Sequence, residues 1–360
     1  EAQHATADYL STLESASEQA STPATAAALL VRAANVLDSA QEDNRAAALY
    51  EKAQRLDPSR GDILLRLERV LRRLGDETRY ASTLESLLDA ATDGERRRAF
   101  GARLALIWIK SNTKLERAGA LLAGAVDTFS ADELREAIAL LESIDDAALD
   151  NAFETAARAD GGNDLLLRAL TRTFDHTPTP ALAREAASIA VKLHDKTASR
   201  FLDAILEGEP TDDDAIWALT QKADWLASDG SIAEAADLLS RAADLANADQ
   251  TQTLRLKAAT LAESVSDFAR SSAEYLKLFE ASPESTEIWP ALLRSLEALG
   301  DADRLRASIA KMAEFTDDSN ERTKLEIFSA DVAHRKDGDL DAWIRELTEI
   351  QSRNTDSNDA

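Results

Sequence analysis

Apolar residues recur along the chain with the spacing of α-helical faces. In residues 286–319, five of them follow one another at i, i+3, i+4, i+7 and i+10, namely Trp289, Leu292, Leu293, Leu296 and Leu299. Gly300 then favours a left-handed helix end, and Asp301 is suited to cap the next helix. A second stripe follows at Leu305, Ile309 and Met312. The pattern predicts two antiparallel helices joined by a tight turn.

The same pattern occurs in four other segments of 34 residues each. They cover residues 27–60, 61–94, 216–249 and 252–285, with the last of these two residues out of phase. A period of this length is typical of helical-repeat proteins. Each hairpin has an apolar face that it cannot bury alone, so neighbouring hairpins must stack. The chain is therefore predicted to be a repeat array rather than a single globular core.

The repeat resembles the tetratricopeptide repeat. That family has Ala at position 20 of its unit, an aromatic residue at 24, Ala at 27 and Pro at 32, and Ala46, Tyr50, Ala53 and Pro58 match these positions. Position 8, usually Gly in the family, holds Ala34, Glu68 or Leu293, and no unit has an aromatic residue at position 11. The resemblance covers about two thirds of the chain. It implies an all-α fold, a right-handed α-α superhelix of about ten helical hairpins.

The period divides the chain into five parts. We expect a capping helix in residues 1–23, tetratricopeptide-like repeats in 24–130 and 213–353, and a polar tail in 354–360. Residues 131–212 break the period, yet they contain helical patterns near 131–143, 147–159, 163–175, 180–193 and 196–207. Because five helices cannot all pair, we expect a slip in the repeat phase there. A boundary between two stacked arrays is the alternative.

Composition supports a folded, almost wholly helical chain. Hydrophobic residues make up 44% and charged residues 30%, and 12 Gly and 7 Pro are too few for the turns of a β-sandwich or barrel. The formal net charge of −25 opposes binding to nucleic acid. The abundance of Arg over Lys and of Asp over Glu suits a GC-rich or salt-adapted bacterium.

No segment resembles a membrane-spanning helix or a signal peptide, so we expect no insertion into a membrane. The chain begins at Glu1 rather than Met, which we interpret as a mature form or an excised fragment. A cytoplasmic location is favoured, and a periplasmic or secreted mature form is the alternative. The absence of Cys excludes disulfides and thiolate metal sites and is compatible with any compartment.

Catalytic and metal-binding patterns are missing from the sequence. The histidines, which are His4, His176, His194 and His334, are far apart in the chain and fit no zinc motif. There is no nucleotide-binding glycine loop and no hydrolase elbow. Asp337, Asp339 and Asp341 begin like a calcium loop, but Ala342 and Thr348 replace the required Gly and Glu. We therefore expect a capped turn there, charge at a helix start at residues 212–214, and neither a catalytic residue, a metal nor a cofactor.

Two kinds of side chain are candidates for binding. Trp108 and Trp289 lie on apolar stripes and are expected in the core, whereas Trp217 takes position 2 of its unit, which in the family faces the groove. The resemblance also implies that positions 6, 9, 12 and 13 of the first helix line a concave groove. Those positions, with a less certain register for the last two residues, hold Arg32, Asn35, Arg66, Arg69, Arg72, Arg73, Arg103 and Lys110.

These arginines make one region of an acidic protein locally positive. Residues 55–110 carry 12 Lys and Arg against 9 Asp and Glu. Guanidinium groups on a rigid wall suit bidentate capture of carboxylates or phosphates, so an acidic peptide or the C-terminus of a polypeptide is the natural ligand. Asn35 matches one residue of the family's two-carboxylate clamp, but Val31 stands where the clamp needs a polar residue. The alternative is that the arginines form ion pairs with neighbouring acids such as Glu68.

The sequence thus predicts a non-enzymatic scaffold or adaptor that binds a protein or peptide segment in the groove of an α-solenoid, and an acidic segment is the natural candidate. A structural spacer or assembly module of a larger repeat protein is one alternative. A regulatory repeat region of a multidomain enzyme is another. Fold-level analogy supports only the class of function.

Overall fold

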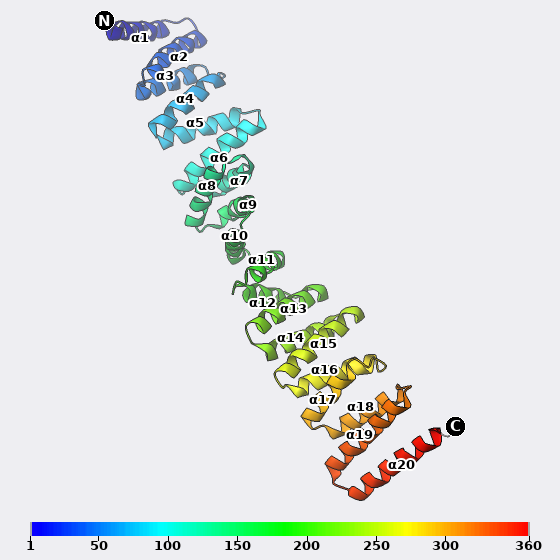
Figure 1. Ribbon diagram of the computed structural model, residues 1–360. Helices are drawn as coiled ribbons and strands as arrows, with labels where there is room; N and C mark the ends of the chain where they lie inside the picture. The colour runs from blue at the N-terminus through cyan, green and yellow to red at the C-terminus, as the bar shows by residue number, and fades with distance from the viewer. Residues whose placement is uncertain (1, 359–360) are drawn as a thin grey trace. The chain divides into compact units, whose positions relative to one another are not determined.

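The computed structural model describes residues 2–358, with side chains described for residues 6–353, and over that range the protein is all-α. It contains twenty α-helices and two short 3-10 helices, and no strand is present among these residues (Figure 1). The predicted all-α fold is confirmed, and twenty helices equal the number in the expected ten hairpins. The polar tail expected at 354–360 lies almost wholly within the last helix as far as residue 358, and residues 359 and 360 lie outside the described range.

The chain divides into two compact units, Glu1–Pro178 and Thr179–Ala360, which we call unit 1 and unit 2. The division falls inside the Pro-Thr-Pro sequence at 178–180. The helices of unit 1 are α1 (Ala2–Glu18), α2 (Pro23–Ser39), α3 (Asp43–Leu56), α4 (Gly61–Leu74), α5 (Glu77–Ala90), α6 (Gly94–Lys110), α7 (Leu115–Ala123), η1 (Val126–Thr128), α8 (Ala131–Ser143), η2 (Ala147–Leu149), α9 (Asp150–Asp160) and α10 (Asn163–His176).

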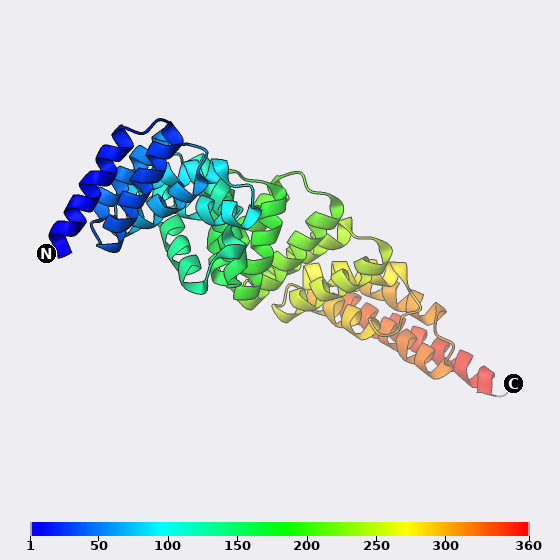
Figure 2. The same cartoon turned by 90° about the horizontal axis from the view of Figure 1, so that it is seen from above.

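Unit 2 contains the remaining ten helices. They are α11 (Pro180–Leu193), α12 (Ala198–Glu207), α13 (Asp212–Ser228), α14 (Ile232–Leu245), α15 (Ala248–Ser264), α16 (Phe268–Ala281), α17 (Trp289–Leu299), α18 (Ala302–Glu314), α19 (Ser319–Asp337) and α20 (Leu340–Asn358). Within each unit, each α-helix packs against the next one in the sequence, with the exception that α7 packs against α6 and α9 rather than α8 (Figures 1 and 2). This packing of consecutive helices is that of a tetratricopeptide-like solenoid.

The core of each unit runs along the stack of hairpins instead of forming one centre. In unit 1 one apolar cluster joins α1 to α4, and a second joins α4 to α10. Tyr50 on α3 is completely buried, as are the small residues Ala46 and Ala53 on either side of it. Small side chains at these positions let helices approach closely. The residues that match the repeat signature are therefore the ones that close the packing between helices.

Tight turns between paired helices follow from specific residues. Gly300 ends α17 at a φ of 76°, and the side chain of Asp301 accepts a hydrogen bond from the Arg304 backbone N–H at the start of α18. Gly75 and Asp76 repeat this arrangement between α4 and α5, with a φ of 70° at the glycine. A positive φ strains any residue that carries a Cβ, so glycine is favoured at both turns.

Part of the apolar stripe predicted for residues 286–319 is not buried. Leu292 and Leu296 are fully buried, but Leu299 is 40% exposed beside the turn. Trp289, expected in the core, is half-buried and donates its indole N–H to the Pro283 carbonyl at 3.1 Å. The reason is that α17 begins only at Trp289, so this residue lies at the helix end and packs against the apolar cluster without being enclosed by it.

Five α-helices are observed where the period breaks, and their starts lie within three residues of the predicted ones: α8 to α12. The short helices η1 and η2 flank α8, and α10 is the last helix of unit 1. Close backbone contact in this part depends on Gly119 of α7, because a Cβ at that position would lie 2.3 Å from the carbonyl oxygen of Ala148 in η2.

We predict opposite effects for two glycine-to-alanine substitutions. Gly119→Ala should lower the free energy of unfolding by about 1–3 kcal/mol, since the backbone of η2 must move. Gly61→Ala should raise it by about 0.4–1 kcal/mol, because Gly61 is helical and a methyl group added there would meet nothing within 4 Å. Urea unfolding followed by circular dichroism measures both. An unchanged free energy of unfolding for Gly119→Ala would show that residue 119 does not lie close to the carbonyl oxygen of Ala148.

Candidate functional site

The predicted groove residues of unit 1 lie on α2, α4 and α6, the first helices of three successive hairpins. We call the surface they form the first-helix face. Direct contacts join these helices: Arg66, Arg69 and Arg73 of α4 reach α2, and Arg103 of α6 reaches α4. The structure therefore brings most of the predicted arginines together on one surface.

Two of these arginines share the carboxylate of Asp38. Arg69 binds it at 2.5 Å, and Arg73 binds both Asp38 and Asp43, the latter at 2.6 Å. The side chain of Asp38 is only 10% exposed, whereas the side chains of Arg69 and Arg73 are 52% and 37% exposed. The hydrogen bond with Asp43, followed by that with Asp38, raises the pKa of Arg73, and the same contact lowers the pKa of Asp43.

The side chain of Asn35 already forms hydrogen bonds with other side chains of unit 1. Its Oδ1 accepts hydrogen bonds from the Tyr50 hydroxyl at 2.6 Å and from Arg66 Nη1 at 2.8 Å. Arg32, on the same helix as Asn35, donates to the hydroxyl of Tyr9 at 3.2 Å. Asn35 thus serves as the meeting point of α2, α3 and α4.

Arg103 and Lys110 of α6 are also paired. Arg103 lies 3.3 Å from the buried carboxylate of Glu68, which also accepts a hydrogen bond from the Tyr80 hydroxyl at 3.0 Å. Burial, with the charge of Glu68 adding to it, raises the pKa of Tyr80 to about 12. Lys110 contacts Glu136 of α8 at 3.1 Å. The ion pair with Glu68 that the sequence offered as an alternative is therefore present.

Arg72 differs from its neighbours. Its side chain is exposed, and no salt bridge engages it among the described residues. Six arginines of this face, at positions 32, 66, 69, 72, 73 and 103, stand against three acids, at positions 38, 43 and 68. The first-helix face therefore keeps an excess of positive charge even though most of its arginines are paired.

A three-residue contact recurs along the array. A tyrosine on the second helix of a hairpin donates to an acceptor on the first helix, and that acceptor also binds an arginine of the next hairpin. The contact is made by Tyr50–Asn35–Arg66, Tyr80–Glu68–Arg103 and Tyr275–Glu263–Arg294. It was not predicted from the sequence, although Tyr50 was identified as a repeat residue. The signal was an Asn or Glu 12 or 15 residues before each tyrosine.

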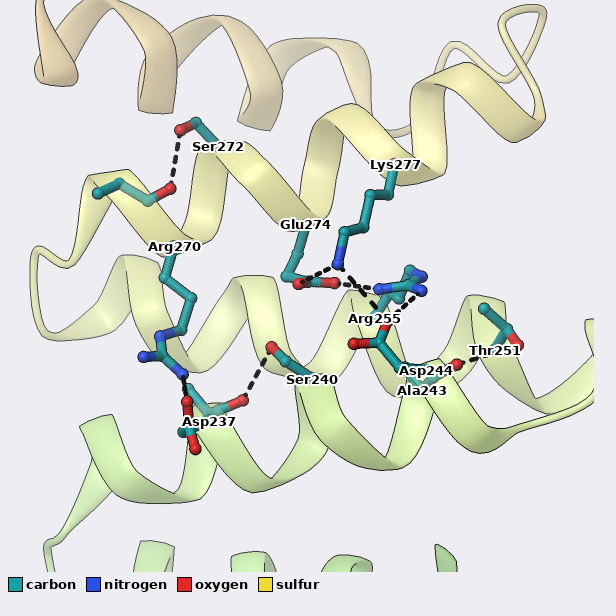
Figure 3. Close-up of polar contacts among 12 residues, drawn as sticks. Asp237, Ser240, Ala243, Asp244, Thr251, Arg255, Arg270, Ser272, Glu274 and Lys277 are labelled. Atoms are coloured by element: carbon teal, nitrogen blue, oxygen red, sulfur yellow. Dashed lines mark hydrogen bonds and ion pairs between the residues drawn. The ribbon is translucent and has the colours of Figure 1, made fainter. Parts of the chain in front are cut away.

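Unit 2 contains a denser charge cluster between α14, α15 and α16. Figure 3 shows Arg255 between Asp244 and Glu274, with Lys277 beside the two acids. Arg255 binds each carboxylate at 2.7 Å, and Glu274 is only 4% exposed. The hydrogen bond from Arg255 is the main cause that lowers the pKa of Asp244. Two cations balance two anions here, so the cluster joins helices and offers no excess charge to a ligand.

A third polar cluster fixes the end of unit 1. Arg172 of α10 binds Asp150 at 2.9 Å and donates to the carbonyl oxygens of Leu141 and Ile144 at the end of α8. His176 Nδ1 lies 2.7 Å from the same Asp150, and its Nε2 lies 3.4 Å from Asp145. The hydrogen bond with Asp150 is the main cause that raises the pKa of His176. This cluster was not identified from the sequence.

The tryptophans singled out in the sequence have different environments. Trp108 is buried, as expected, with Lys114 Nζ 4.5 Å and the Arg117 guanidinium 5.3 Å from its ring centroid. Trp217 is half-buried on α13, and the guanidinium of Arg184 lies 5.0 Å from its ring centroid. Arg184 also pairs with Asp214. Trp217 is thus partly covered by a side chain of its own unit.

The acidic motifs act at helix ends. Asp339 Oδ1 accepts a hydrogen bond from the Ala342 backbone N–H at 2.9 Å, directly after Gly338 ends α19, which confirms the capped turn. Residues 212–214 form the first turn of α13, as expected. No group of three or more metal-ligating side chains occurs among residues whose side chains are described, and the side chain of His4 lies outside them. None of the helices searched in residues 2–358 combines the length and apolar character needed to cross a membrane.

Comparison with solved structures finds helical-repeat proteins at low similarity. The TPR domain of P58(IPK) is 13% identical over 92% of this chain and 99% of that domain, with a TM-score of 0.27. The C-terminal part of a TPR repeat-containing protein from Cytophaga hutchinsonii is 13% identical over 73% and 99%, with a TM-score of 0.31. A tetratricopeptide repeat protein from Parabacteroides merdae is 15% identical over 73% and 96%, with a TM-score of 0.27.

No protein-family model and no curated protein matches the sequence. TM-scores at this level do not establish that two proteins share a fold. The assignment of the fold therefore depends on the helix order and packing of this protein itself. Those are the features of a tetratricopeptide-like helical-repeat array, as the sequence resemblance implied.

We predict that Arg255→Met destabilises unit 2 by about 3 kcal/mol, because it leaves the buried carboxylate of Glu274 with only Lys277 as a charged partner. Arg241→Met is the matched control. Arg241 lies on α14, is exposed and forms no described salt bridge, so its loss should change stability by less than about 0.5 kcal/mol. Urea unfolding measures both variants, and equal effects would contradict a specific role for the cluster.

We also predict that the protein is more stable at pH 6 than at pH 8. Protonated His176 can donate to both Asp150 and Asp145, so its pKa is higher in the folded state than in the unfolded state. The stabilisation is complete below the unfolded pKa of about 6.5 and is lost as pH rises through the folded pKa. His176→Asn should abolish this difference in urea unfolding, and His194→Asn should preserve it. A difference that survives His176→Asn would locate its origin elsewhere.

Proposed function

We propose that this protein is a non-enzymatic scaffold that binds an acidic protein segment on the first-helix face of unit 1. The observation that carries the proposal is the excess of arginine over acidic residues on a surface of an otherwise strongly acidic molecule. Guanidinium groups bind carboxylates in planar, bidentate geometry, so an acidic segment is the complementary ligand.

The ion pairs of this face are compatible with binding. Asp38 pairs with both Arg69 and Arg73, and the side chains of these two arginines remain 52% and 37% exposed. A guanidinium has five N–H donors, and the contacts with Asp38 and Asp43 use only some of them. Fixing a long side chain before binding lowers the entropy lost when the ligand arrives. The paired arginines are thus preorganised, and Arg72 adds a cation that no described salt bridge engages.

A structural spacer is the second candidate, because the same contacts join consecutive hairpins. Arg66, Arg69 and Arg103 each reach a residue of the preceding hairpin, as expected for an array that needs only to be stiff. The two functions differ at Arg72. A spacer tolerates loss of this charge, whereas a binding face does not.

We predict that Arg72→Glu weakens binding of an acidic peptide at least about tenfold, which is the effect of losing one charge-assisted hydrogen bond. The probe is a fluorescently labelled peptide rich in Asp and Glu with a free C-terminus, and fluorescence anisotropy gives the dissociation constant. Arg45→Glu is the control. Arg45 is exposed on α3, the second helix of its hairpin, and pairs only with nearby Glu42.

Circular dichroism must show that both variants keep the helical content of the unmodified protein. Equal weakening by Arg72→Glu and Arg45→Glu would mean that only the overall charge matters. If the unmodified protein does not bind the acidic peptide at all, the spacer function gains support.

A further inference from the structure

Four residues of α4 lie in line on its exposed side, because residues three and four positions apart share one side of a helix. They are Asp62, Leu65, Arg69 and Arg72, and all four are exposed. We call this line of residues the α4 ridge. Arg69 and Arg72 belong to the first-helix face, and Leu65, which is 42% exposed, is the apolar member of the ridge.

The combination of an exposed leucine with two arginines distinguishes the α4 ridge from its equivalents. The same positions of the other repeat segments hold Ala28, Val31, Asn35 and Asp38 in residues 27–60, Trp217, Thr220, Asp224 and Ala227 in 216–249, Thr253, Leu256, Thr260 and Glu263 in 252–285, and Glu287, Pro290, Arg294 and Glu297 in 286–319. Leu256 is 44% exposed, but no cation follows it at these positions. A single exposed leucine is ordinary on a protein surface, so the arginines in line with Leu65 are the informative feature.

Positive charge remains in excess around the α4 ridge when the neighbouring acids are counted. Eight arginines and six acids are found in residues 60–79 and at the neighbouring positions Arg32, Asp38, Asp43 and Arg103. Asp62, on the ridge itself, accepts hydrogen bonds from Arg60 at 2.7 and 3.1 Å, and these lower its pKa. Glu77, in the first turn of α5, is the one acid of this set that no described salt bridge engages. Because Arg72 also has no described salt bridge, its charge is available to a ligand.

The spacing along the α4 ridge matches alternate residues of an extended chain. A helix rises about 1.5 Å per residue, so Arg69 and Arg72 lie about 6 Å and about 10 Å beyond Leu65 along the helix axis. Alternate side chains of an extended chain point to the same side and are about 6.6 Å apart. A segment lying along the ridge can therefore place an apolar side chain over Leu65 and acids two and four residues further over the two arginines. The long arginine side chains can span the remaining difference of about 3 Å.

We infer that the first-helix face recognises an acidic segment through an apolar anchor, which is an aliphatic side chain that packs on Leu65, with acids at the second and fourth residues from it. The inference rests on the proposed function and adds what the partner segment must contain. Arginines alone attract any acidic chain. Contact with Leu65 removes apolar surface from water only when the aliphatic side chain is in register with the acids, so the anchor distinguishes one acidic segment from another.

Three labelled peptides of equal charge test the anchor. The first, Glu-Ser-Glu-Ser-Leu-Ser-Glu-Ser-Glu, has the required spacing in both chain directions. The second has Ser in place of Leu, and the third exchanges Leu with the preceding Ser, so that Leu points to the opposite side of an extended chain. In fluorescence anisotropy with the whole protein, the first peptide should bind about three- to tenfold more tightly than the other two, as expected for partial burial of a leucine. All three affinities should fall with salt, while their ratio stays the same.

Two serine variants locate the anchor. Leu65→Ser should reduce binding of the first peptide to the level of the second and leave binding of the second unchanged. Leu256→Ser is the matched control, since Leu256 has a similar exposure and the same position in its repeat but no arginine in line with it. This control should keep the preference for the first peptide. Both leucines are exposed, so circular dichroism and thermal unfolding of the variants should match those of the unmodified protein.

Four results would overturn the inference. Equal binding of the first and second peptides by the unmodified protein would remove the anchor and leave the proposed function standing. Equal binding of the first and third peptides would show that the spacing between leucine and acids does not matter. A preference for the first peptide that survives Leu65→Ser would place the apolar contact away from the α4 ridge. Binding of none of the peptides would overturn both the inference and the proposed function.

Discussion

Each helical hairpin of this protein has more apolar surface than its two helices can bury between themselves. The stripes of α4, α14 and α18 are buried only because the neighbouring hairpins cover their other sides. Stability therefore comes from a sequence of nearest-neighbour contacts rather than from one centre. The buried alanines and the glycine at position 119 follow from the same constraint, because helices that must stack need small residues where their backbones approach.

Polar contacts add direction to this stacking. The hydrophobic effect is non-directional, whereas a hydrogen bond fixes a distance and an angle between particular atoms. The contact of a tyrosine, an acceptor and an arginine ties two helices of one hairpin to the first helix of the next, and it occurs in both units. Arg255 likewise ties α15 to α14 and α16, and Arg172 ties α10 to α9. Because Glu274 and Asp150 are buried, Arg255 and Arg172 stabilise the fold by giving these carboxylates a charged partner.

The ion pairs that join the hairpins also shape the proposed binding surface, the first-helix face. An arginine that is fixed by an acid of the preceding hairpin presents its remaining donors in a defined orientation, as Arg69 and Arg73 do on the first-helix face.

The sequence alone determined the helices, their pairing and most of the buried stripe, because helical periodicity, glycine turns and Asp caps are local signals. Leu292, Gly300 and Asp301 behave as the pattern predicts, since each depends on residues within one turn. Only the tertiary structure decided which charges are free. Asp38 and Arg73 are 35 positions apart, and no local pattern shows that they meet. It also decided that Asn35 accepts hydrogen bonds from Tyr50 and Arg66 and that His176 lies beside Asp150. These outcomes depend on which helix packs next, and a single helical stripe in the sequence does not contain that information.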